Sequence, residues 1–162
     1  MIRTRAVRLD ECAAVGELTV RAFVDGGHLA ADDEYEQVLS DVAGRVAQAE
    51  VLVAVDGAEL LGSVTVVRPD ETYAQLCGPG ELEFRMLAVH PDHAGRGAGR
   101  ALVRAVLDRA RAEGRTRVLL STLDSMETAR RLYLGLGFGR LPELDRTLPV
   151  GAIVRAMSRS VS

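Results

Sequence analysis

Three residue types are missing from this chain of 162 residues: lysine, asparagine and tryptophan, so all 20 of its basic residues are arginine. Without lysine the chain cannot carry the phosphate-binding loop that ends in Gly-Lys-Ser/Thr, and it cannot form a Schiff base with a carbonyl substrate. These absences exclude nucleotide triphosphatases with that loop and lysine-dependent carbonyl enzymes.

Cysteine and histidine are scarce as well. Cys12 and Cys77 lie far apart without metal-ligand spacing, so we expect them to be small, partly buried hydrophobic residues. His90 and His93 lie on either side of Pro91 and cannot share a helical face, so no metal site is expected there.

Strong net charge and long apolar runs are also absent. The formal charge is −3 with 27% charged and 48% hydrophobic residues, a balance that argues against disorder and against general nucleic-acid binding. No apolar run approaches the ~20 residues of a membrane span, and the first ten residues lack the apolar core of a signal peptide. We therefore expect a cytoplasmic protein with no nucleic-acid or membrane partner.

The hydrophobic pattern predicts one domain of the α/β (α+β) class over residues 1–162: a long antiparallel meander followed by one βαβ unit. The meander includes a hairpin, because Asp56-Gly57 separates two β-branched runs. Ser125 is expected to cap the last helix. Strands are predicted at residues 2–7, 51–55, 60–67, 81–89, 117–121 and 151–157, and helices at residues 10–23, 31–48, 97–113 and 125–136.

The most distinctive stretch is HPDHAGRGAGRALV, residues 90–103, in which three glycines occupy alternate positions directly before a predicted helix. Glycines let the backbone approach a ligand closely, and the N–H groups of a first helical turn converge on an anion. The stretch therefore predicts a phosphate-binding loop. Arg96 and Arg100 extend its basic rim, whereas Arg104 fits a solvated helix face.

Two other interpretations of this loop fit the sequence less well. A dinucleotide-binding fold requires G-x-G-x-x-G after the first strand, but Leu102 takes the place of the third glycine and the loop begins past the middle of the chain. A glycine-rich connection without a ligand explains one or two glycines, but not three on alternate positions.

Two sequence blocks narrow the class further. The first joins LAVHP at residues 87–91 to GRGAGRAL at residues 95–102, and the second is ARRLYLGLGF at residues 129–138. In this order they resemble the V-x-P…[QR]-G-x-G-x-[GA]-x-x-L and A-x-x-x-Y-x-x-x-G-F signatures of the GNAT superfamily of acyl-CoA-dependent N-acetyltransferases. The resemblance covers residues 81–138 closely. It implies a single N-acetyltransferase domain whose mixed, mostly antiparallel central sheet is flanked by helices, with the glycine-rich loop opening the central βαβ helix.

The resemblance also implies a donor and its contacts. Acetyl-CoA is the implied acyl donor, with no metal, and its pantetheine arm is expected to lie along strand residues 86–89. The N–H of Leu87 would then face the thioester carbonyl. The implied coenzyme A contacts are Leu87, Ala88, Val89, Ala94, Gly95, Arg96, Gly97, Ala98, Gly99, Arg100, Ser125 and Met126.

Two residues are implied to act in catalysis. Tyr133 matches the family's frequent general acid; the structural alternative is a tyrosine that only packs under the loop. Glu83 falls where several members carry a carboxylate that draws the proton from the amine, and Glu81 or ordered water are alternatives to it. A solvated strand carboxylate is the structural alternative for Glu83.

The chain departs from the family signature at two positions. Ala94 stands where the family commonly has Gln or Arg, and Met126 stands where an asparagine often opens the second helix. The first departure bears on affinity rather than function, because backbone amides carry phosphate binding. The second removes a pantetheine contact or moves it to Ser125.

The acceptor is the least defined partner. The resemblance implies a primary amine as the acceptor, carried by a small molecule or by a protein N-terminus or lysine. It also implies a homodimer through the C-terminal strands. A catalytically silent acyl-CoA-binding module is the alternative function. An acidic, partly aromatic rim would suit a cationic amine but equally fits an ordinary surface; it comprises Asp25, Asp32, Asp33, Glu34, Asp70, Glu71 and Tyr73.

Overall fold

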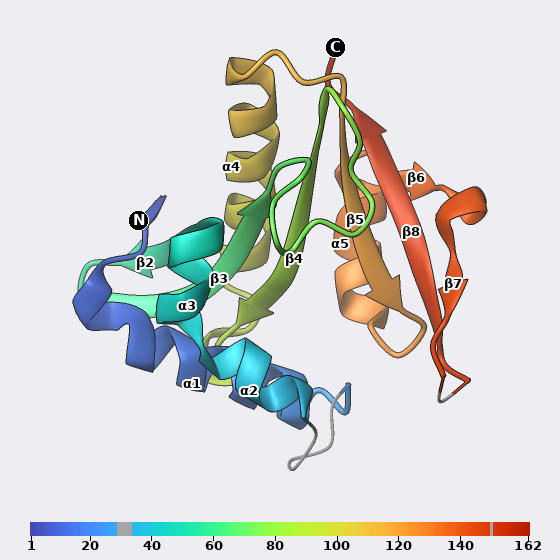
Figure 1. Ribbon diagram of the computed structural model, residues 1–162. Helices are drawn as coiled ribbons and strands as arrows, with labels where there is room; N and C mark the ends of the chain where they lie inside the picture. Colours follow the sequence, from blue (N-terminus) through green and yellow to red (C-terminus); the bar gives the residue numbers. More distant parts are fainter. Residues whose placement is uncertain (29–33, 150) are drawn as a thin grey trace.

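The computed structural model describes residues 1–28, 34–149 and 151–162, which form one mixed sheet with helices on both faces (Figure 1). The strands are β1 (Ile2–Ala6), β2 (Glu50–Asp56), β3 (Glu59–Val67), β4 (Glu81–Val89), β5 (Arg117–Leu123), β6 (Gly139–Arg140), β7 (Arg146–Thr147) and β8 (Ile153–Ser160). The α-helices are α1 (Cys12–Asp25), α2 (Tyr35–Ser40), α3 (Val42–Gln48), α4 (Ala98–Ala112) and α5 (Glu127–Gly135).

The sheet has the order β1-β2-β3-β4-β5-β8-β6, and β7 pairs with β8 beside this path. Every neighbouring pair is antiparallel except β4 and β5, which run parallel and are connected through α4. The predicted class is therefore confirmed: an antiparallel meander leads into one βαβ unit, and the glycine-rich loop opens its helix.

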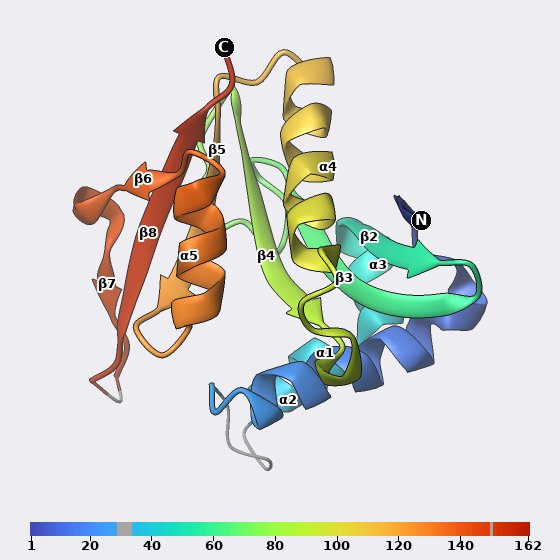
Figure 2. The ribbon, with the colours of Figure 1, turned by 180° about the vertical axis from the view of Figure 1, so that it is seen from behind.

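The helices divide between the two faces of the sheet. α1, α2 and α3 cover the front face in the view of Figure 1, whereas α4 and α5 lie on the opposite face, which Figure 2 shows from behind. None of the helices in the described residues is long and apolar enough to span a membrane.

Strand β2 shows why both faces are covered. Its residues 51–55 are all buried, and alternate side chains of a strand point to opposite faces. Leu52 and Ala54 pack into the core beneath α4, together with Leu102 and Val106, whereas Val51, Val53 and Val55 pack beneath α1 and α3. A strand buried on both sides needs the unbroken apolar run that the sequence has here.

The predicted helix over residues 31–48 is wrong as a single element. Residues 31–33 lie outside the described part of the chain, and the remainder forms α2 and α3, separated at Asp41. Asp41 has φ −84° and ψ 68°, and its carboxylate accepts a hydrogen bond from the N–H of Gly44 at 3.0 Å. Asp41 thus begins a second helix, which the prediction of one continuous helix did not include.

The C-terminal part also differs from the prediction. Ser125 does not cap α5, whose N-cap residue is Met126 and has no side-chain cap. The last strand is Ile153–Ser160 rather than 151–157, and the two-residue strands β6 and β7 were not predicted. Strands of two residues are too short to show a periodic hydrophobic pattern. They form here because both pair with β8.

Leu102 tests the packing of α4 on the sheet. Its side chain is fully buried, so Leu102→Ala should lower the free energy of unfolding by about 2–5 kcal/mol. Leu134→Ala, at a position 57% exposed, should change it by no more than about 0.5 kcal/mol. Denaturant titration measures both values, and equal losses would contradict the assignment of Leu102 to the core.

Candidate functional site

The sheet opens between β4 and β5. Their parallel pairing ends at Phe84 and Leu120, although β4 continues to Val89 and β5 to Leu123. The ribbon shows the two strands diverging beyond this point (Figure 1). The facing edges of both strands are therefore without a strand partner over their last residues.

A bulge in β4 lies at the start of this opening. The register between β3 and β4 shifts between Ser63 and Thr65, which leaves one extra residue in the β4 stretch 85–88. Met86 lies in this bulge with φ 57°, a left-handed conformation that is rare for a residue with a side chain. Neither β3 nor β5 pairs with Met86 and Leu87. Both residues belong to the strand segment that the family resemblance implies to lie along the pantetheine arm.

The glycine-rich loop follows β4 directly and ends at the first turn of α4. Gly95 and Gly97 have φ 83° and 93°, and a Cβ built at either position would meet no atom within 4 Å. The open space thus lies in front of backbone that only glycine adopts easily. Gly97 is the N-cap residue and supplies no side-chain cap, so the first N–H groups of α4 have no intrahelical partner and can receive an anion.

The arginines of the loop have different surroundings. Arg96 turns toward the β2–β3 hairpin, where its guanidinium contacts Asp56 at 2.8 Å and Glu59 at 3.6 Å. Arg100 makes no ion pair in the described chain and lies on the face of α4 next to Gly135. Of the two predicted rim arginines, Arg100 is therefore the one whose charge is uncompensated.

Glu83 is buried, not solvated. Its side chain has no exposed surface, and Oε1 accepts hydrogen bonds from the N–H groups of Gln75, Leu76 and Cys77 at 3.0, 2.9 and 3.2 Å. Oε2 is equally buried and has no partner in the described residues. One oxygen thus holds the loop that precedes β4, and the other remains available as a proton acceptor.

The groups around Glu83 have other roles. Glu81 accepts from the N–H of Gly78 at 2.8 Å and pairs with the guanidinium of Arg117, so its two oxygens are occupied by structural contacts. Burial, followed by the nearby charge of Glu83, raises the pKa of the Cys77 thiol to about 12. Cys77 therefore stays protonated at neutral pH and is not a nucleophile.

Tyr133 lies on the opposite face of β4 from Glu83. Its side chain is 5% exposed, and its ring packs edge-on against Phe84 at 5.7 Å and beside Phe138 at 6.0 Å between centroids. Burial raises the pKa of the phenol above its ordinary value. The hydroxyl makes no hydrogen bond to any described residue, so it is a protonated donor without a protein acceptor.

The two residues predicted at the start of α5 lie at the far side of the opening. Ser125 is exposed, and its hydroxyl lies 2.9 Å from Nδ1 of His28, just beyond the end of α1. Met126 is partly buried and donates its N–H to the carbonyl of Leu123 at 2.9 Å. Ser125 is thus linked to the N-terminal half of the chain, a contact that the sequence did not indicate.

An arginine that the sequence analysis did not single out lies beside Glu83. Arg85 follows Glu83 by two residues on the same strand face and donates to the carbonyl of Tyr73 and the hydroxyl of Tyr35, both at 3.1 Å. Arg45 is fully buried in the same region. A single arginine within a predicted strand or helix belongs to no recognisable sequence motif. The proximity of Arg85 and Arg45 therefore becomes visible only in the folded structure.

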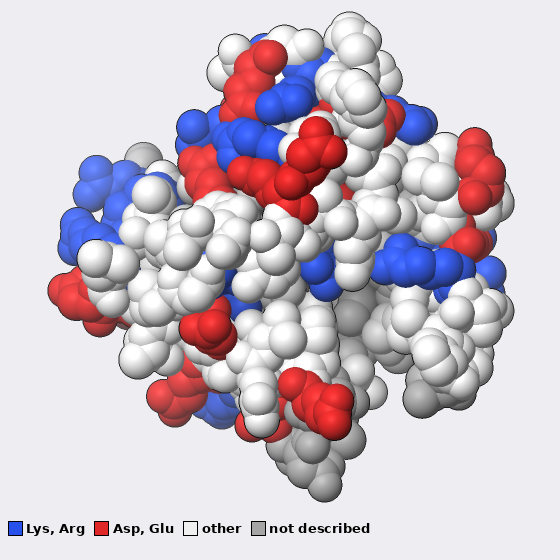
Figure 3. Space-filling view, viewed as in Figure 1, with Lys and Arg blue, Asp and Glu red and all other residues white. Residues whose placement is uncertain are grey.

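The acidic residues considered as a substrate rim lie only partly within the described chain, and some of them have partners there. Asp32 and Asp33 lie outside the described residues, Asp25 pairs with Arg21 at 3.5 Å, and Glu71 accepts from the N–H of Arg68 at 2.6 Å. Figure 3 shows acidic and basic side chains interspersed over this face of the molecule. The surface charge therefore does not by itself indicate a cationic acceptor.

Together these features suit one kind of ligand. The unpaired strand edges can accept an extended chain with amide groups, and the glycine-rich loop at one end can bind a diphosphate. A protonated phenol and a free carboxylate oxygen lie near the other end. The described residues hold no group of three or more His, Cys, Asp or Glu side chains placed to bind a metal ion. These properties define an α/β domain whose divided sheet can accept an extended anionic ligand.

Comparison with known proteins specifies the family. Residues 13–138 match the acetyltransferase (GNAT) family, and the chain belongs to that family. N-acetyltransferase 8B of Rattus norvegicus is 40% identical over 86 residues, which are 53% of this chain and 37% of that protein. The chain thus spans little more than a third of the length of this curated relative.

Solved structures agree with this fold. An acetyltransferase of the GNAT family from Staphylococcus aureus Mu50 superimposes with a TM-score of 0.77 at 14% identity, with all of both chains covered. A putative acetyltransferase from Salmonella typhimurium, solved with acetyl-CoA, gives 0.71 at 21% identity over 100% of this chain and 95% of that one. At these identities the likeness concerns the fold.

The environment of Tyr133 gives a test by titration. Because burial raises its pKa in the folded protein, Tyr133 should contribute no phenolate signal until the pH is well above about 10, the ordinary tyrosine value. Its contribution to folding stability is complete below that pH and is lost as the pH rises toward the folded pKa. The ultraviolet difference between wild type and Tyr133→Phe measures this titration, and a phenolate appearing below pH 10 would contradict the burial.

Proposed function

We propose that this protein is an N-acetyltransferase that transfers an acetyl group from acetyl-CoA to a primary amine by direct attack in a ternary complex. The observation that carries the proposal is the combination of the β4–β5 opening with an uncapped α4 N-terminus at its end. Acetyl-CoA supplies an activated acetyl group as a thioester, and both its diphosphate and its amide-containing arm fit these two features. Family membership supports the same reaction class.

The main chain supplies most of the proposed donor contacts. Gly95 and Gly97 leave space for the diphosphate, and the N–H groups of residues 98–100 point to it. The stretch from Met86 to Val89, which does not pair with β5, lies where the pantetheine arm would pair, with the N–H of Leu87 toward the thioester oxygen. Since these contacts are to backbone, the short side chain of Ala94 is compatible with binding.

Two side chains move protons in this proposal. Glu83, through Oε2 or through a water molecule, takes a proton from the amine, whose nitrogen is mostly protonated at neutral pH and must be neutral to attack. Tyr133 gives its phenolic proton to the sulfur as the carbon–sulfur bond breaks, and solvent reprotonates it. A phenol whose pKa is raised is fully protonated before the reaction, as this role requires.

The acceptor remains a primary amine of a small molecule or of a protein N-terminus or lysine. The cytoplasmic location, the single domain over residues 1–162 and a homodimer through the C-terminal strands stay predictions from the sequence and the family resemblance. The alternative, a silent acyl-CoA-binding module, is motivated by Ala94 and Met126. Release of free thiol with a panel of amines, above a control without amine, separates the two functions.

Binding is tested by introducing a charge into the loop. Gly97→Glu should weaken acetyl-CoA binding by at least about tenfold, or 1.4 kcal/mol, because the carboxylate repels the diphosphate. Gly114→Glu is the matched control: it lies just past the other end of α4, also has positive φ and open space, and introduces the same strain and charge. Calorimetric titration with acetyl-CoA measures the affinity of both variants. Equal affinities of Gly97→Glu and Gly114→Glu would refute the loop as the diphosphate site.

The proton donor is tested by Tyr133→Phe. The ring packing is kept and no protein partner loses a hydrogen bond, so the variant should fold and bind acetyl-CoA as wild type does. Its kcat should fall by about 10²-fold or more, the usual contribution of a general acid. Thiol release gives kcat and calorimetry gives the affinity; an unchanged kcat would remove Tyr133 from this role.

A further inference from the structure

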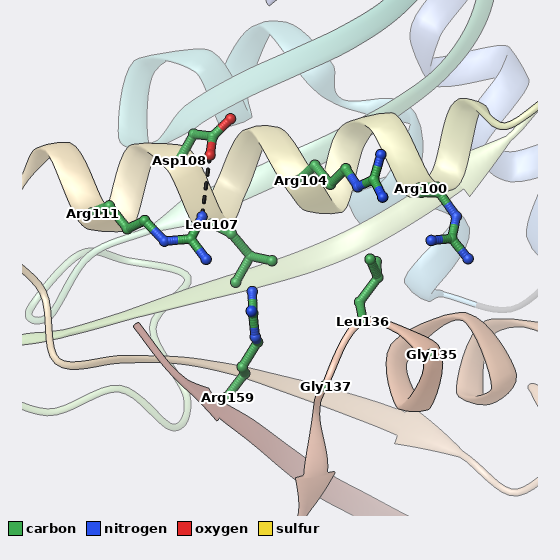
Figure 4. A pocket seen from close by; sticks show the side chains of 9 residues that line it. All are labelled: Arg100, Arg104, Leu107, Asp108, Arg111, Gly135, Leu136, Gly137 and Arg159. Carbon is green, nitrogen blue, oxygen red and sulfur yellow. Dashed lines mark hydrogen bonds and ion pairs between the residues drawn. The ribbon is translucent and has the colours of Figure 1, made fainter. Parts of the chain in front are cut away.

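A hollow lies between α4 and the C-terminal end of α5 on the face seen in Figure 2, and it begins at Arg100 in the first turn of α4. Its volume is about 540 Å³. Figure 4 shows its walls, with one face of α4 on one side and α5 and β8 on the other. The hollow, here called the arginine groove, is lined by Arg100, Arg104, Leu107, Asp108, Arg111, Gly135, Leu136, Gly137 and Arg159.

The groove has an excess of uncompensated positive charge. Arg111 pairs with Asp108 at 3.2 Å, but Arg100, Arg104 and Arg159 make no ion pair or side-chain hydrogen bond within the described ranges. Arg100 and Arg104 are four residues apart on one helix face, an arrangement of like charges that destabilises an isolated helix. A bound anion between them would remove this repulsion.

Glycines keep the groove open on its other wall. A Cβ at Gly137, where φ is 89°, would lie 3.1 Å from Nε of Arg159, and a Cβ at Gly135 would approach Nη2 of Arg100 to 3.9 Å. Larger side chains at these positions would therefore enter the space between the arginines. Leu107 and Leu136 add apolar surface to the cationic lining, so the groove suits a nucleoside phosphate better than a bare ion.

The groove begins where the diphosphate site ends. At a rise of about 1.5 Å per residue, Arg100 and Arg104 lie roughly 4.5 and 10 Å along the helix from Gly97. Arg159 extends into the same space from β8, across from Leu107 (Figure 4). A nucleotide held by its diphosphate at the loop can thus place a second phosphate between Arg104 and Arg159.

We propose that Arg104 and Arg159 bind the 3′-phosphate on the ribose of coenzyme A, with Arg100 between this group and the diphosphate. The inference rests on the proposed function and adds a specificity: the protein distinguishes coenzyme A from its 3′-dephospho form. A phosphomonoester carries close to two negative charges at neutral pH, and guanidinium groups bind it with two parallel hydrogen bonds. Arg104, expected from the sequence on a solvated face, is assigned to ligand binding here.

The test compares coenzyme A with 3′-dephospho-coenzyme A by calorimetric titration. Wild type should bind coenzyme A at least about tenfold more tightly, since charge-assisted hydrogen bonds to the phosphate are present in only one ligand. Arg104→Ala and Arg159→Ala should each lose most of this ratio by weakening coenzyme A alone. Arg3→Ala, which removes an exposed arginine on β1 at the far edge of the sheet, should keep the full ratio.

The outcomes separate this proposal from the proposed function. Equal affinities of wild type for the two ligands, or equal weakening of both in Arg104→Ala, would overturn the 3′-phosphate site and leave the acetyltransferase proposal standing. Failure of wild type to bind coenzyme A would overturn both. Arg104 is exposed and makes no ion pair in the described structure, so Arg104→Ala should fold. If Arg159→Ala fails to fold, the affinities of Arg104→Ala for the two ligands decide the question.

Discussion

The left-handed backbone at Met86 is the constraint on which the site depends. A non-glycine residue at this φ costs roughly 1–2 kcal/mol, and the surrounding pairs of β4 must hold it in place. The bulge removes Met86 and Leu87 from pairing with β3, and the parallel pairing to β5 ends just before it. The strained residue thus lies where β4 and β5 separate, at the strand edge proposed to pair with the ligand.

The proposed proton acceptor and the proposed proton donor lie on opposite faces of one strand. Successive residues of β4 point to opposite sides, which places Glu83 beneath the preceding loop and Phe84 against Tyr133. The carboxylate and the phenol are thus held by separate packing environments. Burial shifts the phenol toward its protonated form, whereas three backbone N–H groups hold one carboxylate oxygen. Proton acceptor and proton donor need such unlike surroundings if both are to act at the same pH.

Much of the fold could be predicted from the sequence because its signals are periodic or local. Strand 81–89 has the predicted bounds. The loop was predictable because Gly95 and Gly97 adopt positive φ angles, which glycine reaches easily. The Asp41 break was missed because a capping aspartate among helix formers looks like a surface residue. The contacts of Arg85 and Ser125 join residues 50 and 97 positions apart in the chain, and no short-range pattern records such distances. The arginine groove was missed because its walls come from three separate elements.

The contact between His28 and Ser125 has a mechanical consequence. Within the described residues, no strand pairing beyond Phe84 and Leu120 joins the part of the sheet that contains β4 to the part that contains β5. At the open end, a hydrogen bond between the His28 imidazole, whose pKa is lowered by burial, and the Ser125 hydroxyl joins the two parts. Such a neutral bond contributes only about 1 kcal/mol, less than twice the thermal energy. Breaking this bond therefore costs little free energy, and the open end can widen at this contact without the loss of any strand pairing.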